Sequence, residues 1–526
     1  MARVSRYGWA WCASVALAVA GGACSGASGS IGDQGSGVGA PGQNGAGGVP
    51  PAPAGGAGGG PAVAPGSTIF AVSYGDEHEQ DFQALASDGA GNFYIAGQEF
   101  GPNPPDPTQG TPSNVFVVKY SPTGELMWRQ PIPIDPNNAL ALFAIAVQPT
   151  TGAVILSGAF AGTIQLGPST LTSGRDPSIG TPVLNVFTAL LDSAGYFVWS
   201  RAYTSTARAF PEQVFSAANG DILVVGSSDN NATVGGGPLC CRSGQFNGPV
   251  TYLARYSPAG DFLWSNAIGG DFAYEYAGVN AAGDMVVGGE MNGPATFEGQ
   301  TFPAAGDGTG LGQTGLVLRV DNQGSEVWAE VYPTDDLVRI GATIDDKQNV
   351  ALFGGLSGTV DFGNGVSLAA GNNGSPVFQA GLVAGLAPDG TARWAVQFPA
   401  SGQDQAFPET VATDPSGNVV VAGTVSGGLA VGGLSTGPDD TRFVVKYGAD
   451  GTFLWGRGFP IQVNPMTAQN IALTVDPWGQ IGFAGPFDQP IDFGTGPLAV
   501  TGQASALEPG EPAFLPDNVY LVKLAP

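Results

Sequence analysis

Charged residues are scarce in this chain of 526 residues, and basic ones especially so. They make up 11% of the sequence, and 43 acidic residues stand against 17 Lys and Arg. The net charge of −26 makes nucleic acid and anionic lipid surfaces poor partners, because both would repel the protein. Cations, glycans and basic proteins stay open as ligands, and the acidity serves solubility equally well.

Histidine and cysteine are scarcer still. His78 is the one histidine, and no Gly-x-Ser-x-Gly element accompanies it, which argues against a serine triad. Two of the four cysteines are adjacent, Cys240 and Cys241. Their Cα atoms are about 3.8 Å apart, below the usual disulfide range, so a bridge between them would be strained. We predict a vicinal disulfide that stiffens its loop, with a redox or ligand-contact role as the alternative.

No apolar run near the N-terminus is long enough to span a bilayer. Residues 7–20 are apolar, follow a short basic segment and lead to small residues before Cys24, a pattern typical of an export signal. The end of this segment resembles a bacterial lipobox, although Gly21 stands where that family prefers Leu. The resemblance implies that residues 1–23 are removed and Cys24 is lipidated at the outer membrane or cell surface. Cleavage after Ala20, giving a secreted or periplasmic protein, is the alternative.

Residues 24–66 lack large apolar side chains almost entirely. Gly, Ala, Pro and Ser dominate this stretch, and Asp33 is its single charged residue. Such a composition cannot offset the entropy of ordering, so we predict a disordered tether with a reach of roughly 35–40 Å. A tether behind a lipidated Cys24 would hold a folded domain at a surface.

A repeat marked by glycine and tryptophan fills the rest of the chain. Six tryptophans occur as Gly-x-x-x-Trp, 61 to 71 residues apart, which indicates one supersecondary unit copied many times. These are Trp128, Trp199, Trp264, Trp328, Trp394 and Trp455.

Each unit contains two strand–turn–strand segments. In residues 85–97, Asp88 opens a tight turn and Gly91 closes it, because Asp caps a turn by hydrogen bonding and Gly accepts positive φ. In residues 116–128, apolar and aromatic runs flank a Pro/Gly turn. Seven copies of the first segment occur. Four strands per unit predict an all-β fold, a seven-bladed β-propeller of four-stranded blades over residues 67–526.

Link lengths predict the order of strands within a blade. The Trp strand follows its predecessor through a tight turn, whereas the link to the next unit is longer and can cross roughly 14 Å from outer to inner edge. The Trp strand is therefore expected outermost. The last unit lacks a Trp strand, and an orphan strand at residues 68–74 precedes the first unit. We predict that this N-terminal strand closes the seventh blade, with Phe70 in the Trp place.

The units resemble SBBP-type β-propeller repeats of bacterial exported proteins, through Gly-Asn-x-x-x-x-Gly and Lys-Tyr-x-x-x-Gly-x-x-x-Trp segments across residues 67–526. The resemblance implies an extracellular propeller without a common activity or catalytic residues. We therefore expect a monomeric, non-catalytic binding or scaffold module for a protein, glycan or cation. One alternative is a hydrolase or lyase on glycans with acidic catalytic residues. Another is a quinoprotein-like propeller or its relative in outer-membrane assembly, whose repeats are shorter and number eight.

Glutamates at one repeat position form the first candidate site. Glu212, Glu275 and Glu409 each lie eight residues before the glycine that closes the first turn, where Gln83 is equivalent. They should begin innermost strands near one mouth of the channel. We predict an acidic rim for a cation or basic ligand, with solvent-facing strand ends as the alternative.

A short acidic loop around the single histidine is the second candidate site. Asp76, His78, Glu79 and Asp81 are carboxylates and an imidazole that could hold a divalent cation, although they lack a regular ligand spacing. No other cofactor is predicted, and a solvated loop is the alternative.

Three further expectations concern the faces of the propeller. The basic residue before each second turn (Lys119, Arg255, Arg319, Lys446, Lys523) is interpreted as solvated, and the tryptophans as packing between blades. Both tight turns of each unit should lie on one face, and the long insertions on the other. A partner is expected to bind the insertion face, and shortening insertions should abolish binding without lowering stability.

Overall fold

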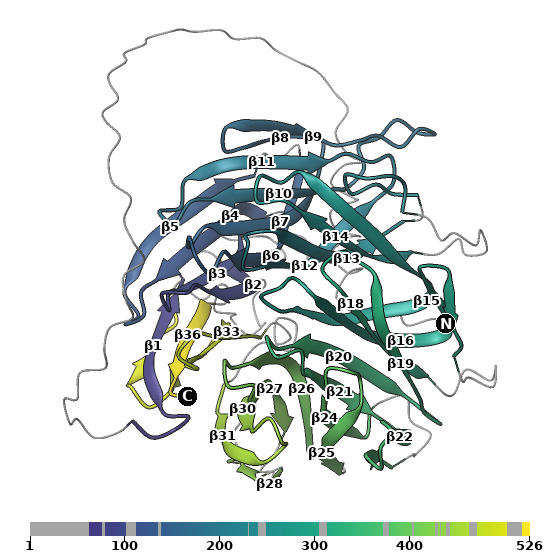
Figure 1. Ribbon diagram of the computed structural model, residues 1–526. Coiled ribbons are helices and arrows are strands. Elements are labelled where there is room, and N and C mark those ends of the chain that lie inside the picture. The colour runs from purple at the N-terminus through teal and green to yellow at the C-terminus, as the bar shows by residue number, and fades with distance from the viewer. Residues whose placement is uncertain are drawn as a thin grey trace, which may run out of the picture.

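The computed structural model describes residues 63–526 except for thirteen internal segments. These are 76–78, 101–111, 135–137, 230, 240–248, 305–312, 372–377, 402–403, 427–429, 432, 438–441, 462–470 and 502–517. The described chain forms antiparallel β-sheets and contains no helix (Figure 1). It therefore also contains no helix that could cross a membrane. The all-β prediction is confirmed.

The described chain forms three four-stranded and two eight-stranded antiparallel sheets, besides two-stranded hairpins. Grouped by the sequence repeat, their strands make units 1 to 7, with 18-residue β15 shared by units 3 and 4 and β25 paired with β26 between units 5 and 6. Units 1 to 3 are β2 (Glu79–Ser87), β3 (Phe93–Phe100), β4 (Pro112–Tyr120), β5 (Leu126–Pro133); β6 (Ala139–Val147), β7 (Val154–Ala161), β10 (Asn185–Leu191), β11 (Phe197–Tyr203); and β12 (Ala209–Ser216), β13 (Ile222–Ser228), β14 (Val250–Tyr256), β15 (Phe262–Val279). Units 4 and 5 add β16 (Met285–Phe297), β18 (Thr314–Val320), β19 (Glu326–Pro333); and β20 (Val338–Ile344), β21 (Val350–Leu356), β24 (Ala380–Leu386), β25 (Ala392–Ser401). Units 6 and 7 are β26 (Asp404–Thr413), β27 (Val419–Ser426), β30 (Arg442–Tyr447), β31 (Phe453–Phe459); and β32 (Ala472–Val475), β33 (Ile481–Phe487), β36 (Asn518–Leu524), β1 (Thr68–Tyr74).

The order of strands within a unit agrees with the link-length argument. The strand before the first turn forms one edge of each unit, and the Trp strand forms the other edge, as β2 and β5 do in unit 1. The first strands gather near the centre of the molecule (Figure 1), and contacts connect β2 with β6, β6 with β12, β20 with β26 and β26 with β32. Because the strands alternate in direction, both tight turns of a unit lie at the same end.

The N-terminal strand completes the last unit, as predicted. β1 pairs antiparallel with β36, from Thr68 opposite Leu524 to Tyr74 opposite Val519, and the two lie side by side in Figure 1. Phe70 is 9% exposed, and its ring packs on Gly124 in the second turn of unit 1. The first strand of unit 7, β32, also contacts β2 of unit 1. The last and first units therefore touch at both their inner and outer strands.

Aspartate side chains hold the first turns as the sequence indicates. Oδ1 of Asp88 accepts hydrogen bonds from the backbone N–H groups of Ala90 and Asn92, each at 2.9 Å. Gly91 closes this turn at φ +75°, which a residue with a Cβ adopts only with strain. The same carboxylate geometry recurs at Asp414.

In five of the six repeats the tryptophan ring packs on the glycine that closes a second turn in the next unit, and Trp455 packs on Gly66, just before β1. The ring of Trp264 covers Gly324, where an added Cβ would lie 2.9 Å from the indole. Its Nε1 also donates to the carbonyl oxygen of Asn322 at 3.1 Å. The corresponding pairs are Trp128 with Gly195, Trp199 with Gly260, Trp328 with Gly390, Trp394 with Gly451 and Trp455 with Gly66. The tryptophans thus pack units together, which confirms that prediction.

The basic residue of the third strand is buried, so the prediction that it is solvated is wrong. Lys119, Arg255, Arg319, Lys446 and Lys523 are 2–5% exposed. Each pairs with an aspartate of the first turn in its own unit, at 2.9 Å for Lys446 with Asp414. Burial opposes ionisation of Asp414, but Lys446 and hydrogen bonds from Asn418 hold its pKa below the usual value. A buried charge requires such a partner.

The two units without a basic residue adapt in different ways. In unit 2 the acid is missing as well as the base, which Ala189 replaces. Gln148 opens the turn where units 1, 5, 6 and 7 have Asp, and Ala153 follows the closing glycine where units 3 and 4 have Asp. In unit 5 Asp345 is retained, and Gly385 takes the place of the base. The indole of Trp394 lies over Gly385, where an added Cβ would come within 2.4 Å of it.

Small hairpins from the insertions pack on outer strands and are part of the core, whereas the insertion strand β17 pairs with the second strand of unit 4. They are β8 (Thr163–Leu166) with β9 (Ser169–Thr172), β22 (Thr359–Asp361) with β23 (Ser367–Ala369), β28 (Ala430–Val431) with β29 (Leu434–Ser435), β34 (Ile491–Asp492) with β35 (Pro497–Leu498), and β17 (Gln300–Phe302) on β16. Phe362 and Phe493 in these hairpins are almost fully buried. The expectation that insertions can be shortened without loss of stability is therefore wrong for these hairpins.

Candidate functional site

Several predicted site residues lie outside the described part of the chain. These are Cys24, Asp76, His78, Cys240 and Cys241. Glu79 begins β2, and Asp81 on the same strand accepts a hydrogen bond from Nε2 of Gln83 at 2.6 Å. Within the described residues, no three His, Cys, Asp or Glu side chains are grouped to hold a metal ion.

The three rim glutamates share a structural feature that their spacing did not reveal. Glu212, Glu275 and Glu409 are each the extra residue of a β-bulge on the first strand of their unit, and Gln83 is the same in unit 1. A bulge redirects one side chain out of the regular alternation of a strand. The repeat therefore directs the bulge residue of each of these units in an equivalent way.

Unit 3 places Glu212 in surroundings that disfavour its charge. Burial raises the pKa of Glu212 to about 7, Ser227 opposes this by donating a hydrogen bond, and the nearby charge of Glu275 adds to the rise. Burial also raises the pKa of Glu275, which Arg339 on β20 partly offsets through an ion pair. The cluster thus extends across units 3, 4 and 5.

Unit 4 adds a second carboxylate that sequence reasoning missed. Glu290 lies on β16 directly after Gly289, and burial together with the charge of Glu275 raises its pKa to about 7. Ser227 and Thr424 occupy the equivalent place in units 3 and 6. The signal available in the sequence was the residue after this second-strand glycine, which is charged in unit 4 and carries a hydroxyl in units 3 and 6.

Glu409 on β26 extends the cluster to unit 6. Burial raises its pKa, which Arg442 on β30 lowers in part, followed by a hydrogen bond from Thr424. Its Oε2 atom is excluded from solvent and has no hydrogen-bond partner. The bulge cluster, defined as Glu212, Glu275, Glu290, Arg339 and Glu409, is thus acidic and incompletely paired.

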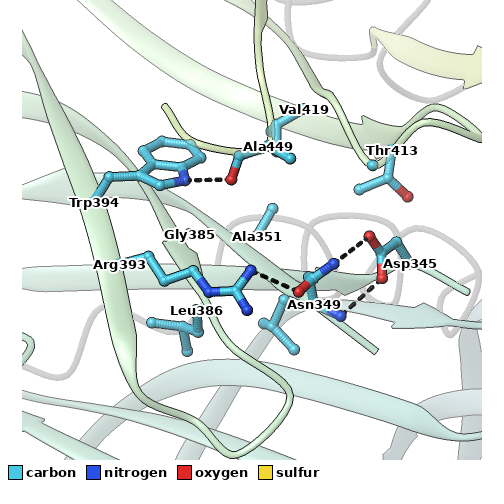
Figure 2. A pocket seen from close by; sticks show the side chains of 12 residues that line it. Asp345, Asn349, Ala351, Gly385, Leu386, Arg393, Trp394, Thr413, Val419 and Ala449 are labelled. Carbon is cyan, nitrogen blue, oxygen red and sulfur yellow. Dashed lines mark hydrogen bonds between the residues drawn. The ribbon is translucent and has the colours of Figure 1, made fainter. Parts of the chain in front are cut away.

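Two hollows lie elsewhere. Figure 2 shows the seam between units 5 and 6, where Nε1 of Trp394 donates to the carbonyl of Ala449 and Arg393 donates to Asn349. Its cavity of about 10 Å³ has room for about one water molecule. A groove of about 520 Å³ lies between β9, β11 and unit 3, where Arg201 pairs with exposed Asp261. Neither hollow includes a residue of the bulge cluster.

The stability of the protein should fall as pH rises through neutrality, in part because of Glu212. An acid with a pKa raised from 4.5 to about 7 stabilises the fold below pH 4.5, and this contribution is lost as pH rises through 7. We expect a slope of at most about 1.4 kcal/mol per pH unit from this group. Glu212→Gln should flatten the slope in urea unfolding measured between pH 5 and 8.

A matched variant separates the contribution of Glu212 from that of the histidine. His78→Gln removes the single histidine and leaves the Glu212 contribution in place. An unchanged slope in Glu212→Gln would contradict the assignment.

Comparison with known proteins identifies no family. No protein-family model matches the chain, and no curated protein matches its sequence. Solved structures that are partly similar include a protein of unknown function from Bacteroides caccae, with 9% identity over 75% of this chain and 94% of that chain, TM-score 0.31. A protein of unknown function from Dyadobacter fermentans has 13% identity over 72% and 98%, TM-score 0.35. A gluconolactonase from Xanthomonas campestris has 12% identity over 87% and 88%, TM-score 0.28. TM-scores this low carry no argument about function.

Proposed function

We propose that the chain is a seven-bladed β-propeller of the SBBP type, tethered outside the cell, that binds a ligand at the bulge cluster. Contacts between unit 7 and unit 1 support closure of the ring. Phe70 packs on Gly124, and Nζ of Lys523 donates to the carbonyl of Pro122 at 3.2 Å, just as the basic residues of other units reach their neighbours. The seven equivalent units are then the blades.

The observation that carries the binding function is the cluster of bulge glutamates. Glu212, Glu275 and Glu409 come from three different units, and burial raises the pKa of each. Carboxyl groups whose pKa is raised by burial reduce the stability of the fold at neutral pH, and such groups are typical of functional sites. We therefore place the ligand at this cluster and not over the tight turns.

The second candidate function is cleavage of a glycan, as a hydrolase or a lyase. Glu275 pairs with Arg339, whereas Glu290 beside it has a pKa of about 7. A pair of carboxyl groups, one of them with a pKa near neutrality, is what acid–base cleavage of a glycosidic bond uses.

A glycan panel separates the two functions. For a binding module, purified mature protein should release no reducing ends from any glycan. Turnover that Glu290→Gln abolishes, with an unchanged melting temperature, would establish the second function and overturn the first.

Lipidation at Cys24 gives a prediction of its own. Mature protein should partition into the detergent phase of a Triton X-114 separation, because a lipid chain adds buried methylene groups. Cys24→Ala should move the protein to the aqueous phase. Equal partitioning of both forms would remove the anchor and leave a secreted or periplasmic protein.

A further inference from the structure

The bulge residue of the first strand and the residue that follows the glycine opposite the bulge, on the second strand, form a repeated pair. This glycine is Gly226, Gly289 or Gly423 in units 3, 4 and 6. Ser227 donates a hydrogen bond to Glu212 in unit 3, and Thr424 donates to Glu409 in unit 6. In unit 4 this donor is replaced by Glu290, and the bulge residue Glu275 turns instead to the guanidinium of Arg339. The pair therefore changes from carboxylate with hydroxyl to carboxylate with cation.

Two buried hydrogen-bond acceptors at the positions of this repeated pair lack donors. Oε2 of Glu409 is inaccessible to solvent and unpartnered. Gln98 holds the place of Ser227 and Thr424 in unit 1, is 2% exposed, and its Oε1 also has no partner. A buried acceptor without a donor destabilises the fold, because the hydrogen bond it made to water is not replaced. Two unpartnered acceptors, one from each position of the repeated pair, indicate a ligand that supplies donors.

The surroundings of the bulge glutamates indicate which class of ligand supplies these donors. A bare metal ion fits poorly, because the described residues contain no group of three metal-ligating side chains. A guanidinium fits, because Arg339 already pairs with the bulge glutamate Glu275. Glu212 and Glu409 hold the same bulge position in units 3 and 6, and neither forms a direct ion pair among the described residues.

We infer that Glu212 and Glu409 bind the guanidinium or ammonium group of an arginine or lysine side chain from a basic partner protein. This assignment deepens the proposed function and rests on it. The net charge of the whole chain, −26, attracts such a partner at long range, while the bulge carboxylates provide the specific contact.

Short peptides test the assignment on the mature protein. The probes are Gly-Gly-Arg-Gly-Gly and the same peptide with citrulline, which keeps the shape of arginine and removes its charge. Isothermal titration should show the arginine peptide binding at least about tenfold more tightly, because a charge-assisted hydrogen bond is roughly twice as strong as a neutral one. Equal affinities would overturn the inference.

Matched variants locate the contact. Glu212→Gln and Glu409→Gln should each weaken arginine-peptide binding about tenfold, since the pair loses its charge. Glu125→Gln removes the same charge from an exposed position beside a tight turn and should change affinity less than about twofold. Equal losses in all three would mean that net charge alone attracts the peptide.

The remaining outcomes distinguish the inference from the proposed function. Tighter binding of spermidine than of the arginine peptide would point to a free amine and overturn the protein partner. A neutral glycan whose binding Glu212→Gln abolishes would keep the site and overturn the cationic ligand. No loss of any binding in Glu212→Gln or Glu409→Gln, with both variants folded, would overturn the proposed function as well.

Discussion

Replacing Lys446 with Met should lower the free energy of unfolding by about 3–5 kcal/mol, the cost of leaving one member of a buried ion pair alone. Lys446 Nζ lies 2.9 Å from Oδ2 of Asp414, and both side chains are 5% exposed. Removing the ammonium leaves the carboxylate in a site from which water is largely excluded. Urea unfolding at pH 7 measures the loss.

Two comparisons show whether burial is the cause. Adding Asp414→Asn to Lys446→Met should recover most of the stability, because unit 2 is built with a neutral pair, Gln148 and Ala189, at these positions. Arg201→Met breaks an exposed pair with Asp261 and should cost about 0–1 kcal/mol. A double variant no more stable than Lys446→Met would contradict this explanation.

The effect of Lys446→Met should also depend on pH. Because the pKa of Asp414 is held below 3.8, the ion pair contributes above that value, and the contribution is lost as pH falls through the lower folded-state pKa. The variant and the parent protein should therefore converge in stability in strong acid, as measured by urea unfolding below pH 3.8.

Deleting β1, Thr68–Tyr74, should cost more than any single substitution. The deletion exposes the edge of β36 and removes Phe70 from its place against Gly124, and a buried Phe alone is worth about 3–5 kcal/mol. It also removes Tyr74, whose hydroxyl donates to Glu99 Oε1 at 2.8 Å and accepts from Arg129. The deleted protein should aggregate or melt at a much lower temperature.

A side-chain variant separates the strand from its anchor. Phe70→Ala keeps the backbone pairing with β36 and should lose only the packing on Gly124, so it should melt between the parent and the deletion. An unchanged melting temperature after deletion of Thr68–Tyr74 would mean that β1 does not complete unit 7.

The strands, their order and the tryptophans that pack between units could be predicted because the sequence signals for them are local. Asp88 and Gly91 specify a turn through their own hydrogen bond and φ angle, and the Gly-x-x-x-Trp spacing repeats wherever one unit meets the next. Phe70 was identified because the last unit lacked a strand that the first segment could supply. Each of these inferences needed only neighbouring residues or the count of units.

The burial of the basic residues could not be predicted by the same means. A lysine such as Lys446 is ordinarily solvated, and its partner Asp414 is 32 residues away in the sequence. The joint loss of acid and base in unit 2, at Gln148 and Ala189, was the available signal. It becomes meaningful only once the turn and the third strand are known to lie beside each other.

The sequence by itself determined an all-β chain of repeated four-stranded units whose last unit is completed by the N-terminal strand. It could do so because periodicity and turn chemistry act over short distances. Tertiary structure alone decided that Glu275 meets Arg339, 64 residues away in the next unit, and that Glu290 lies close enough to Glu275 to raise its pKa. Those meetings depend on bulges that redirect side chains and on the contact of first strands across units. Pairing between units is a property of their arrangement in space, which no single repeat encodes.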